Sequence, residues 1–99
     1  MFEKKLKRIS RETVGYVRVR GRNARDADEL TMIVSYGYSN LERCDWYISL
    51  LRSGDKKYIV PQSLEELKSI RDELKSVLDE ISSRPAFRKK GSIQDYYDD

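Results

Sequence analysis

The stretch from Ser63 to Pro85, "SLEELKSIRDELKSVLDEISSRP", restricts the fold of the 99-residue chain more than any other. Ser63 and Glu66 form a capping-box pattern, in which each side chain satisfies a backbone N–H group that the first helical turn leaves free. Pro85 cannot continue a helix and predicts its end near Arg84. One long amphipathic helix is therefore predicted. Its apolar stripe, at three- and four-residue spacing, consists of Leu64, Leu67, Ile70, Leu74, Val77, Leu78 and Ile81.

The residues before this helix alternate in the manner of strands. The segment 13–22, "TVGYVRVRGR", is rich in β-branched residues and places Val17 and Val19 on one face. The segments 29–39, 44–51 and 57–61 continue the pattern, and Gly37 is expected to mark a weakened strand end or a bulge. The Ser-Gly-Asp sequence within "RSGDKK" favours the positive φ of a tight turn.

These elements predict an α+β fold. We expect a four-stranded antiparallel β-meander with one long C-terminal amphipathic helix packed on one face, because a helix of about 31 Å can cover a sheet of eight-residue strands. Residues 13–84 would form this single domain. Residues 1–12 would form a basic arm or a short helix, since Phe2, Leu6 and Ile9 have helical spacing. Residues 85–99 are expected to be a flexible tail, first basic and then acidic.

Positive charge is concentrated at the front of the chain. Residues 1–25 carry nine Lys and Arg against two acids, whereas residues 26–83 carry seven against twelve. The whole chain has a net charge of only +3. A polyanion is therefore the first partner to consider, with nucleic acid ahead of an acidic membrane.

The composition argues against enzymatic chemistry. The chain has no histidine, and its one cysteine, Cys44, lies in an alternating segment where a small buried hydrophobe is expected. Asp26, Asp28 and Glu29 are explained by a polar turn, since the rest of a calcium-loop pattern is missing. We expect no enzyme, no cofactor and no metal. The sequence also lacks a signal-like apolar run and any stretch near the ~20 apolar residues of a membrane span, so a cytoplasmic protein is expected.

The predicted sheet leaves one face uncovered by the helix, and basic and aromatic residues fall on that face. Arginine binds phosphate with paired hydrogen bonds, and tyrosine can stack on a base. Two other readings stay open, an arginine row paired with Glu42 and Asp45, and a protein interface. The predicted binding residues are Tyr16, Arg18, Arg20, Arg22 and Tyr47 on the sheet, with Lys4, Lys5, Lys7, Arg8 and Arg11 as a phosphate-clasping arm.

The order of elements, a basic N-terminus followed by four strands and a C-terminal helix, resembles the single-strand-binding domain of the general transcriptional coactivator and Whirly type. The resemblance covers residues 13–83 by element order alone, and no residue motif carries it. In that architecture the sheet face holds nucleic acid and helices pair the subunits.

The sequence therefore predicts a small, non-enzymatic nucleic-acid-binding accessory protein that slightly favours single strands. The alternative is a protein-interaction module, an inhibitor or adaptor from a virus or mobile element, that acts through the sheet face or the helix. We further expect a homodimer, because the stripe of residues 64–81 also suits a coiled-coil seam. The acidic end of the tail, "QDYYDD", is a candidate contact for a protein partner.

Overall fold

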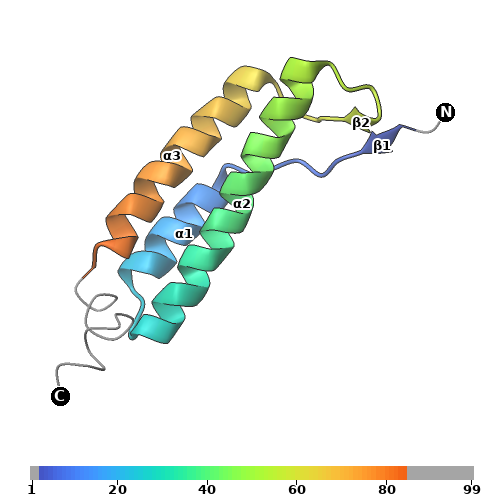
Figure 1. Ribbon diagram of the computed structural model, residues 1–99. Coiled ribbons are helices and arrows are strands. Elements are labelled where there is room, and N and C mark those ends of the chain that lie inside the picture. Colours follow the sequence, from blue (N-terminus) through green and yellow to red (C-terminus); the bar gives the residue numbers. More distant parts are fainter. Residues whose placement is uncertain (1–2, 85–99) are drawn as a thin grey trace.

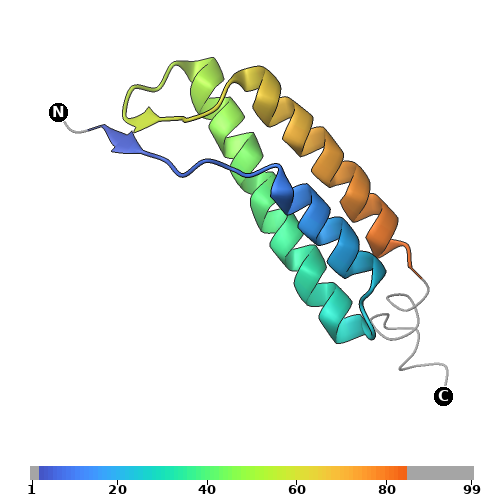
Figure 2. The same cartoon turned by 180° about the vertical axis from the view of Figure 1, so that it is seen from behind.

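A computed structural model of the chain describes residues 3–84, and within them it is a bundle of three helices. The helices are α1 (Glu12–Arg22), α2 (Ala27–Ser53) and α3 (Leu64–Ser82). A two-stranded parallel sheet, β1 (Lys4–Lys5) with β2 (Tyr58–Ile59), projects from one end of the bundle (Figures 1 and 2). The predicted four-stranded antiparallel meander is therefore wrong, and the resemblance in element order to the coactivator and Whirly domains falls with it. The tail prediction, residues 85–99, lies outside the described residues.

Helix α3 confirms the predicted C-terminal helix. Ser63 is its N-cap, and the side-chain oxygen of Ser63 accepts a hydrogen bond from the N–H of Glu66. The helix buries the predicted stripe against α1 and α2, while Leu64 is partly buried at its start. Sequence periodicity and capping were sufficient here because both signals agree over five turns. The buried members are Leu67, Ile70, Leu74, Val77, Leu78 and Ile81.

Helix α2 replaces the second and third predicted strands with one continuous element. Asp26 caps its start by accepting a hydrogen bond from the N–H of Glu29. Gly54 ends it at a φ of 70°, so the positive φ predicted for this glycine is correct, although it ends a helix and not a strand. The buried residues recur at helical steps and form the core face, namely Ala27, Leu30, Ile33, Val34, Gly37, Asn40, Cys44, Tyr47 and Ile48.

Helix α1 replaces the first predicted strand. Val14, Val17 and Gly21 are buried at spacings of three and four, whereas Val19, which the strand reading placed in the core, is 55% exposed. Gly21 lets α1 approach α3 closely, since a Cβ atom there would lie 2.7 Å from Ile81. Gly37 does the same for α2, where a Cβ atom would lie 2.5 Å from Leu78. Both glycines thus serve close helix packing, not the bulge predicted at Gly37.

The N-terminal segment is extended, so the short helix proposed for it is absent from residues 3–11. Lys4 N–H donates to the carbonyl of Lys57 at 2.9 Å, and Leu6 N–H donates to that of Ile59 at 3.0 Å. Ile9 is buried, and its N–H and C=O groups both bond to the side chain of Gln62, at 2.7 and 2.8 Å. These contacts tie the start of the chain to the connection between α2 and α3.

Candidate nucleic-acid interface

The predicted row of binding residues is divided by the helical geometry of α1. Tyr16 and Arg20 lie four residues apart on the flank that faces α2, where the edge of one tyrosine ring meets Tyr36 at a centroid distance of 5.5 Å. The Arg20 guanidinium lies 5.6 Å from the centre of the Tyr16 ring. Arg22 lies on the other flank of α1 and donates a hydrogen bond to Glu80 of α3. The positive charge of Arg18 also lowers the pKa of Glu80. The structure does not bring these four side chains together, and no sheet face carries them.

The arginines beside α3 are paired with carboxylates. Three glutamates stand seven residues apart on α3, so that they fall on nearly the same side of the helix. Arg11 donates to Glu73 at 2.8 Å, and Arg22 donates two bonds of 3.0 Å to Glu80. The third glutamate, Glu66, pairs with Arg8 of the predicted arm. The hydrogen bond from Arg22 lowers the pKa of Glu80 and raises the pKa of Arg22 itself. These three arginines bind the bundle together.

Tyr47, the proposed second stacking ring, is buried in the bundle at 2% exposure. Its hydroxyl donates to the carbonyl of Lys7 at 2.7 Å and accepts from Arg43 at 3.1 Å. The ring therefore presents no open face to a base. The contact holds the N-terminal segment against α2, which is a structural role.

Lysines of the predicted arm gather with two others around the small sheet. Lys4 pairs in register with Tyr58 and Lys5 with Ile59, and Lys7 follows on the same extended segment. Lys56 and Lys57 precede β2, and all five side chains belong to exposed residues. We call Lys4, Lys5, Lys7, Lys56 and Lys57 the basic tip. Within residues 3–84 none of these five ammonium groups forms an ion pair with a carboxylate.

The basic tip is held in place by an aromatic contact with α2. Trp46 meets Tyr58 edge to face, with ring centroids 5.2 Å apart. Glu3 and Asp55 are the acids in the tip segments, so five lysines outnumber them. Asp55 also accepts a hydrogen bond from the backbone N–H of Lys57. Sequence reasoning missed Lys56 and Lys57 because the pairing of β1 with β2, which joins distant segments, carries no local signal.

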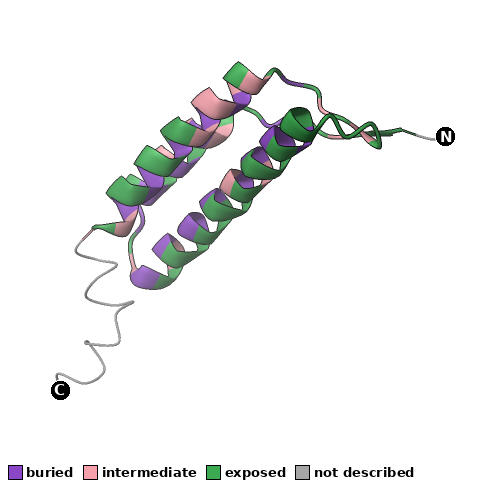
Figure 3. Cartoon of the chain, turned by 45° about the horizontal axis from the view of Figure 1, so that its top comes forward, coloured by how far each residue is buried: buried purple, intermediate pink, exposed green. Residues whose placement is uncertain are grey.

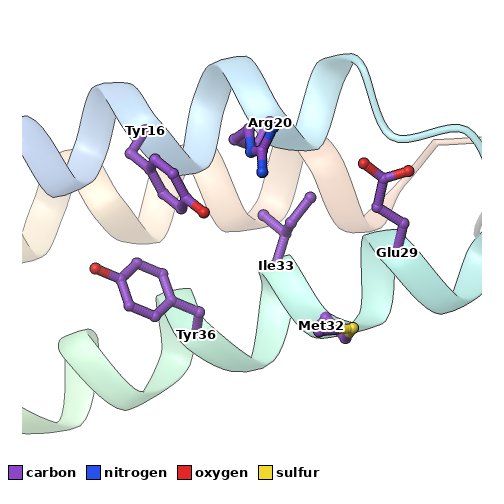
Figure 4. A pocket seen from close by; sticks show the side chains of 6 residues that line it. All are labelled: Tyr16, Arg20, Glu29, Met32, Ile33 and Tyr36. Carbon is purple, nitrogen blue, oxygen red and sulfur yellow. The ribbon is translucent and has the colours of Figure 1, made fainter.

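A shallow groove lies between α1 and α2, away from the basic tip. Figure 4 shows Tyr16 and Tyr36 facing one another across it, with Ile33 at its floor. Arg20 and Glu29 stand near the other end, and Met32 lies along its outer rim. The groove combines apolar walls with few charges.

The remaining candidates for chemistry have structural roles. Cys44 is fully buried, and burial raises the pKa of its thiol to about 11, which leaves very little nucleophilic thiolate near neutral pH. Asp26 caps α2, and Glu29 accepts a bond from the N–H of Arg25. Over residues 3–84 there is no group of three or more acidic or cysteine side chains placed to hold a metal ion.

Comparison with known proteins finds no matching family model and no significant match among curated proteins or solved structures. In the described part of the chain, no helix has both the length and the apolar character required to cross a bilayer.

Proposed function

We propose that the protein binds nucleic acid through the basic tip. The observation that carries the proposal is the set of five exposed lysines that two distant segments bring together without carboxylate partners in the described residues. The arginines Arg11 and Arg22, in contrast, already have partners on α3. The binding surface is therefore the end of the bundle that carries the sheet, not a sheet face lined by arginine and tyrosine.

The chemistry of the basic tip suits phosphate groups. A lysine ammonium is a compact charge with three donors on a flexible stem, and it binds phosphate without fixing a particular geometry. Each phosphate that a lysine neutralises releases counterions, so affinity falls steeply as salt rises. Contacts of this kind position a protein on a nucleic acid backbone without reading its sequence.

The described structure favours backbone contacts over base stacking. Tyr47 is buried, the half-exposed rings of Tyr16 and Tyr36 lie at the groove away from the basic tip, and Trp46 meets Tyr58 edge to face. No row of open rings accompanies the lysines, so the stacking argument for single strands loses its support. We therefore expect a duplex to bind at least as tightly as a single strand of the same length, because its denser charge gives a salt slope of about −0.9 per phosphate against about −0.7 for a single strand.

The proposal is tested by fluorescence anisotropy with labelled DNA and RNA oligonucleotides between 25 and 200 mM NaCl, a roughly eightfold range of salt over which a slope near −4 lowers the affinity by about 10³-fold or more. We expect micromolar binding at the lowest salt. The slope of log K against log salt should be about −3.6 to −4.5 for a duplex, because four to five phosphates are neutralised at about −0.9 each. Absence of binding at the lowest salt would contradict the proposal.

A matched pair of variants locates the site. Lys5→Gln with Lys57→Gln removes two charges of the basic tip, one from each paired segment. Lys68→Gln with Lys75→Gln removes the same charge from α3. We expect a loss of about tenfold or more for the first pair and less than about twofold for the second, since each lost phosphate contact removes a counterion-release term. An equal loss in both pairs would mean that overall charge, not the basic tip, binds the ligand.

The alternative role, a protein-interaction module, depends on other residues. The sheet face proposed for it does not exist in residues 3–84, and the exposed large apolar residues lie on α1 and α2, with Ile59 of β2 as the exception. Capture of a specific protein that survives nuclease treatment and is unaffected by Lys5→Gln with Lys57→Gln would favour that role over nucleic-acid binding.

A further inference from the structure

Helix α2 carries a second stripe of residues that the bundle does not bury. Met32, Tyr36, Ser39, Arg43 and Trp46 follow one another at steps of four and three, so they share one side of the helix. Met32 is 73% exposed, Tyr36 47% and Trp46 42%. We call these five residues the outer stripe. Figure 3 shows exposed surface continuing along the length of α2 on the side away from the core.

Two residues of α1 widen the apolar part of the outer stripe. Tyr16 is 48% exposed and faces Tyr36 across the groove (Figure 4). Val19, on the next turn of α1, is 55% exposed. Bulky apolar side chains are normally the first to be covered when a chain folds. Here they lie side by side and remain open to solvent in the described structure.

The exposed area is large for a monomer of this size. The aromatic residues Tyr16, Tyr36 and Trp46 each present about 200 Å² when fully open, and Val19 and Met32 somewhat less, so exposed fractions of 42–73% leave roughly 500 Å² of mostly apolar surface. That is the size of the largest apolar patch on a typical monomer, about 300–600 Å², and such patches are often functional. With Ser39 and Arg43 included, the surface approaches the roughly 800 Å² that each partner buries in a standard interface.

The composition of the outer stripe is that of an interface core. Tyrosine, tryptophan, methionine and arginine are the residues enriched there, and other charged residues are depleted. Arg43 is the only charged member of the outer stripe. The stripe of α3, which also had the spacing of a coiled-coil seam, is buried within the bundle and is not available to a second subunit.

We propose that a second copy of this chain covers the outer stripe, so that two α2 helices pack antiparallel about a two-fold axis that crosses the stripe between Ser39 and Arg43. The self-complementary stripe supports a two-fold pairing, because such a contact uses the same surface on both subunits. In this register Tyr36 lies opposite Trp46 of the second copy, and Ser39 lies opposite Arg43 of the second copy.

Charges at the ends of α2 select the antiparallel orientation. Asp28 and Glu29 lie in the first turn, and Arg52 lies in the last. Antiparallel packing places the acidic start of each helix near the basic end of the other and opposes the two helix dipoles. Parallel packing would place like charges together.

Sedimentation equilibrium tests the dimer with a matched pair of variants. Met32→Glu places a charge on the outer stripe, and Thr31→Glu places the same charge on the neighbouring, exposed residue that faces away from it. We expect a wild-type dimer, a dissociation constant raised about 30-fold or more by Met32→Glu, and a change below about threefold for Thr31→Glu. Circular dichroism verifies that both variants remain helical. A wild-type monomer at millimolar concentration, or equal effects of the two variants, would overturn the proposal.

Spin labels on introduced cysteines test the orientation. The native Cys44 is buried and its thiol pKa is raised to about 11, so under native conditions the label goes to the new site. Labels at Ser39→Cys should lie close together, with backbones offset by about 6 Å along the helix, and labels at Ser53→Cys should be about 36 Å apart or more. Short distances at both sites indicate parallel helices and would overturn the arrangement. The dimer does not depend on nucleic-acid binding, so either proposal can fail alone.

Discussion

Two groups of basic side chains in this protein differ in whether carboxylates pair with them. Arg11, immediately before α1, and Arg22, at its end, meet Glu73 and Glu80 of α3, and their charge joins the two helices. The lysines of the basic tip lie in and beside a short sheet that projects from the bundle, and no carboxylate in residues 3–84 pairs with them. The number of basic residues in a segment therefore does not locate a polyanion site. Their positions relative to acids on the neighbouring element decide it.

The largest effect is expected from a substitution that detaches the basic tip from the helical bundle. Gln62→Leu removes both hydrogen bonds to the backbone of Ile9 and leaves two buried polar groups without partners. We expect a loss of about 2–4 kcal/mol in the free energy of unfolding, measured by urea denaturation. Pro61→Ala, at the exposed neighbouring position, is the control. A loss below about 0.5 kcal/mol would show that Gln62 does not hold the segment.

Tyr47→Phe should weaken the attachment of the N-terminal segment to α2 by less than Gln62→Leu does. This change keeps the buried ring but removes the hydroxyl that donates to the carbonyl of Lys7. We expect a loss of about 1–2 kcal/mol in unfolding free energy and a modest weakening of nucleic-acid binding, because Lys7 is less ordered. Tyr38→Phe, at a ring that is 43% exposed, should change neither measurement. Equal effects at the two tyrosines would contradict the role given to Tyr47.

Removing the carboxylate partners of the arginines should make these side chains available to phosphate as well. Glu73→Gln with Glu80→Gln frees Arg11 and Arg22 from their partners. We expect anisotropy titrations to show binding a few-fold tighter at low salt, with a salt slope steeper by about 1–2, because two more cations can reach phosphates. Glu42→Gln with Glu65→Gln removes the same charge from exposed residues and is the control. If both double variants tighten binding equally, the ion pairs with Glu73 and Glu80 do not keep Arg11 and Arg22 from binding phosphate.

The smallest expected effect is a pH dependence of the Arg22–Glu80 pair. The hydrogen bond from Arg22 lowers the pKa of Glu80 from its ordinary value of 4.5. The unfolded chain therefore takes up the proton at higher pH than the folded chain, so the stability from this pair is present above pH 4.5 and is lost as the pH falls through the lowered pKa. The melting temperatures of wild type and Glu80→Gln should differ slightly at pH 7 and draw closer as the pH is lowered below 4.5. A difference that persists at the lower pH would exclude this origin.

The helix at residues 64–82 was predictable because capping and periodicity gave the same answer over a long stretch. The segments before it were misread because periods of 2 and 3.6 coincide over a few residues. A strand over residues 29–39 would place Leu30, Met32 and Val34 on one face, yet Met32 is 73% exposed and Ile33 is buried. β-branched residues favoured the strand reading, and tertiary packing of an amphipathic helix overrode that preference.

The candidate site was predictable only in part. Lysines at positions 4, 5 and 7 were expected to be available for phosphate, and they lie in the basic tip. Whether Arg22 is available depends on its distance from Glu80, which follows only once α1 is helical and packed against α3. Similarly, Gly37 could not be recognised as a close-packing position before Leu78 was placed beside it.

The joining of the two ends of the basic tip affects how the chain assembles. Ile9 and Gln62 are 53 positions apart, a separation similar to the 58 between Arg22 and Glu80, but the sheet beside them has only two residues in each strand and is mostly exposed. This closure is expected to come last during folding and to reopen first in the native state. Backbone amides of Lys4 and Leu6 should accordingly exchange with deuterium well before those in the middle of α2, while the three helices remain intact.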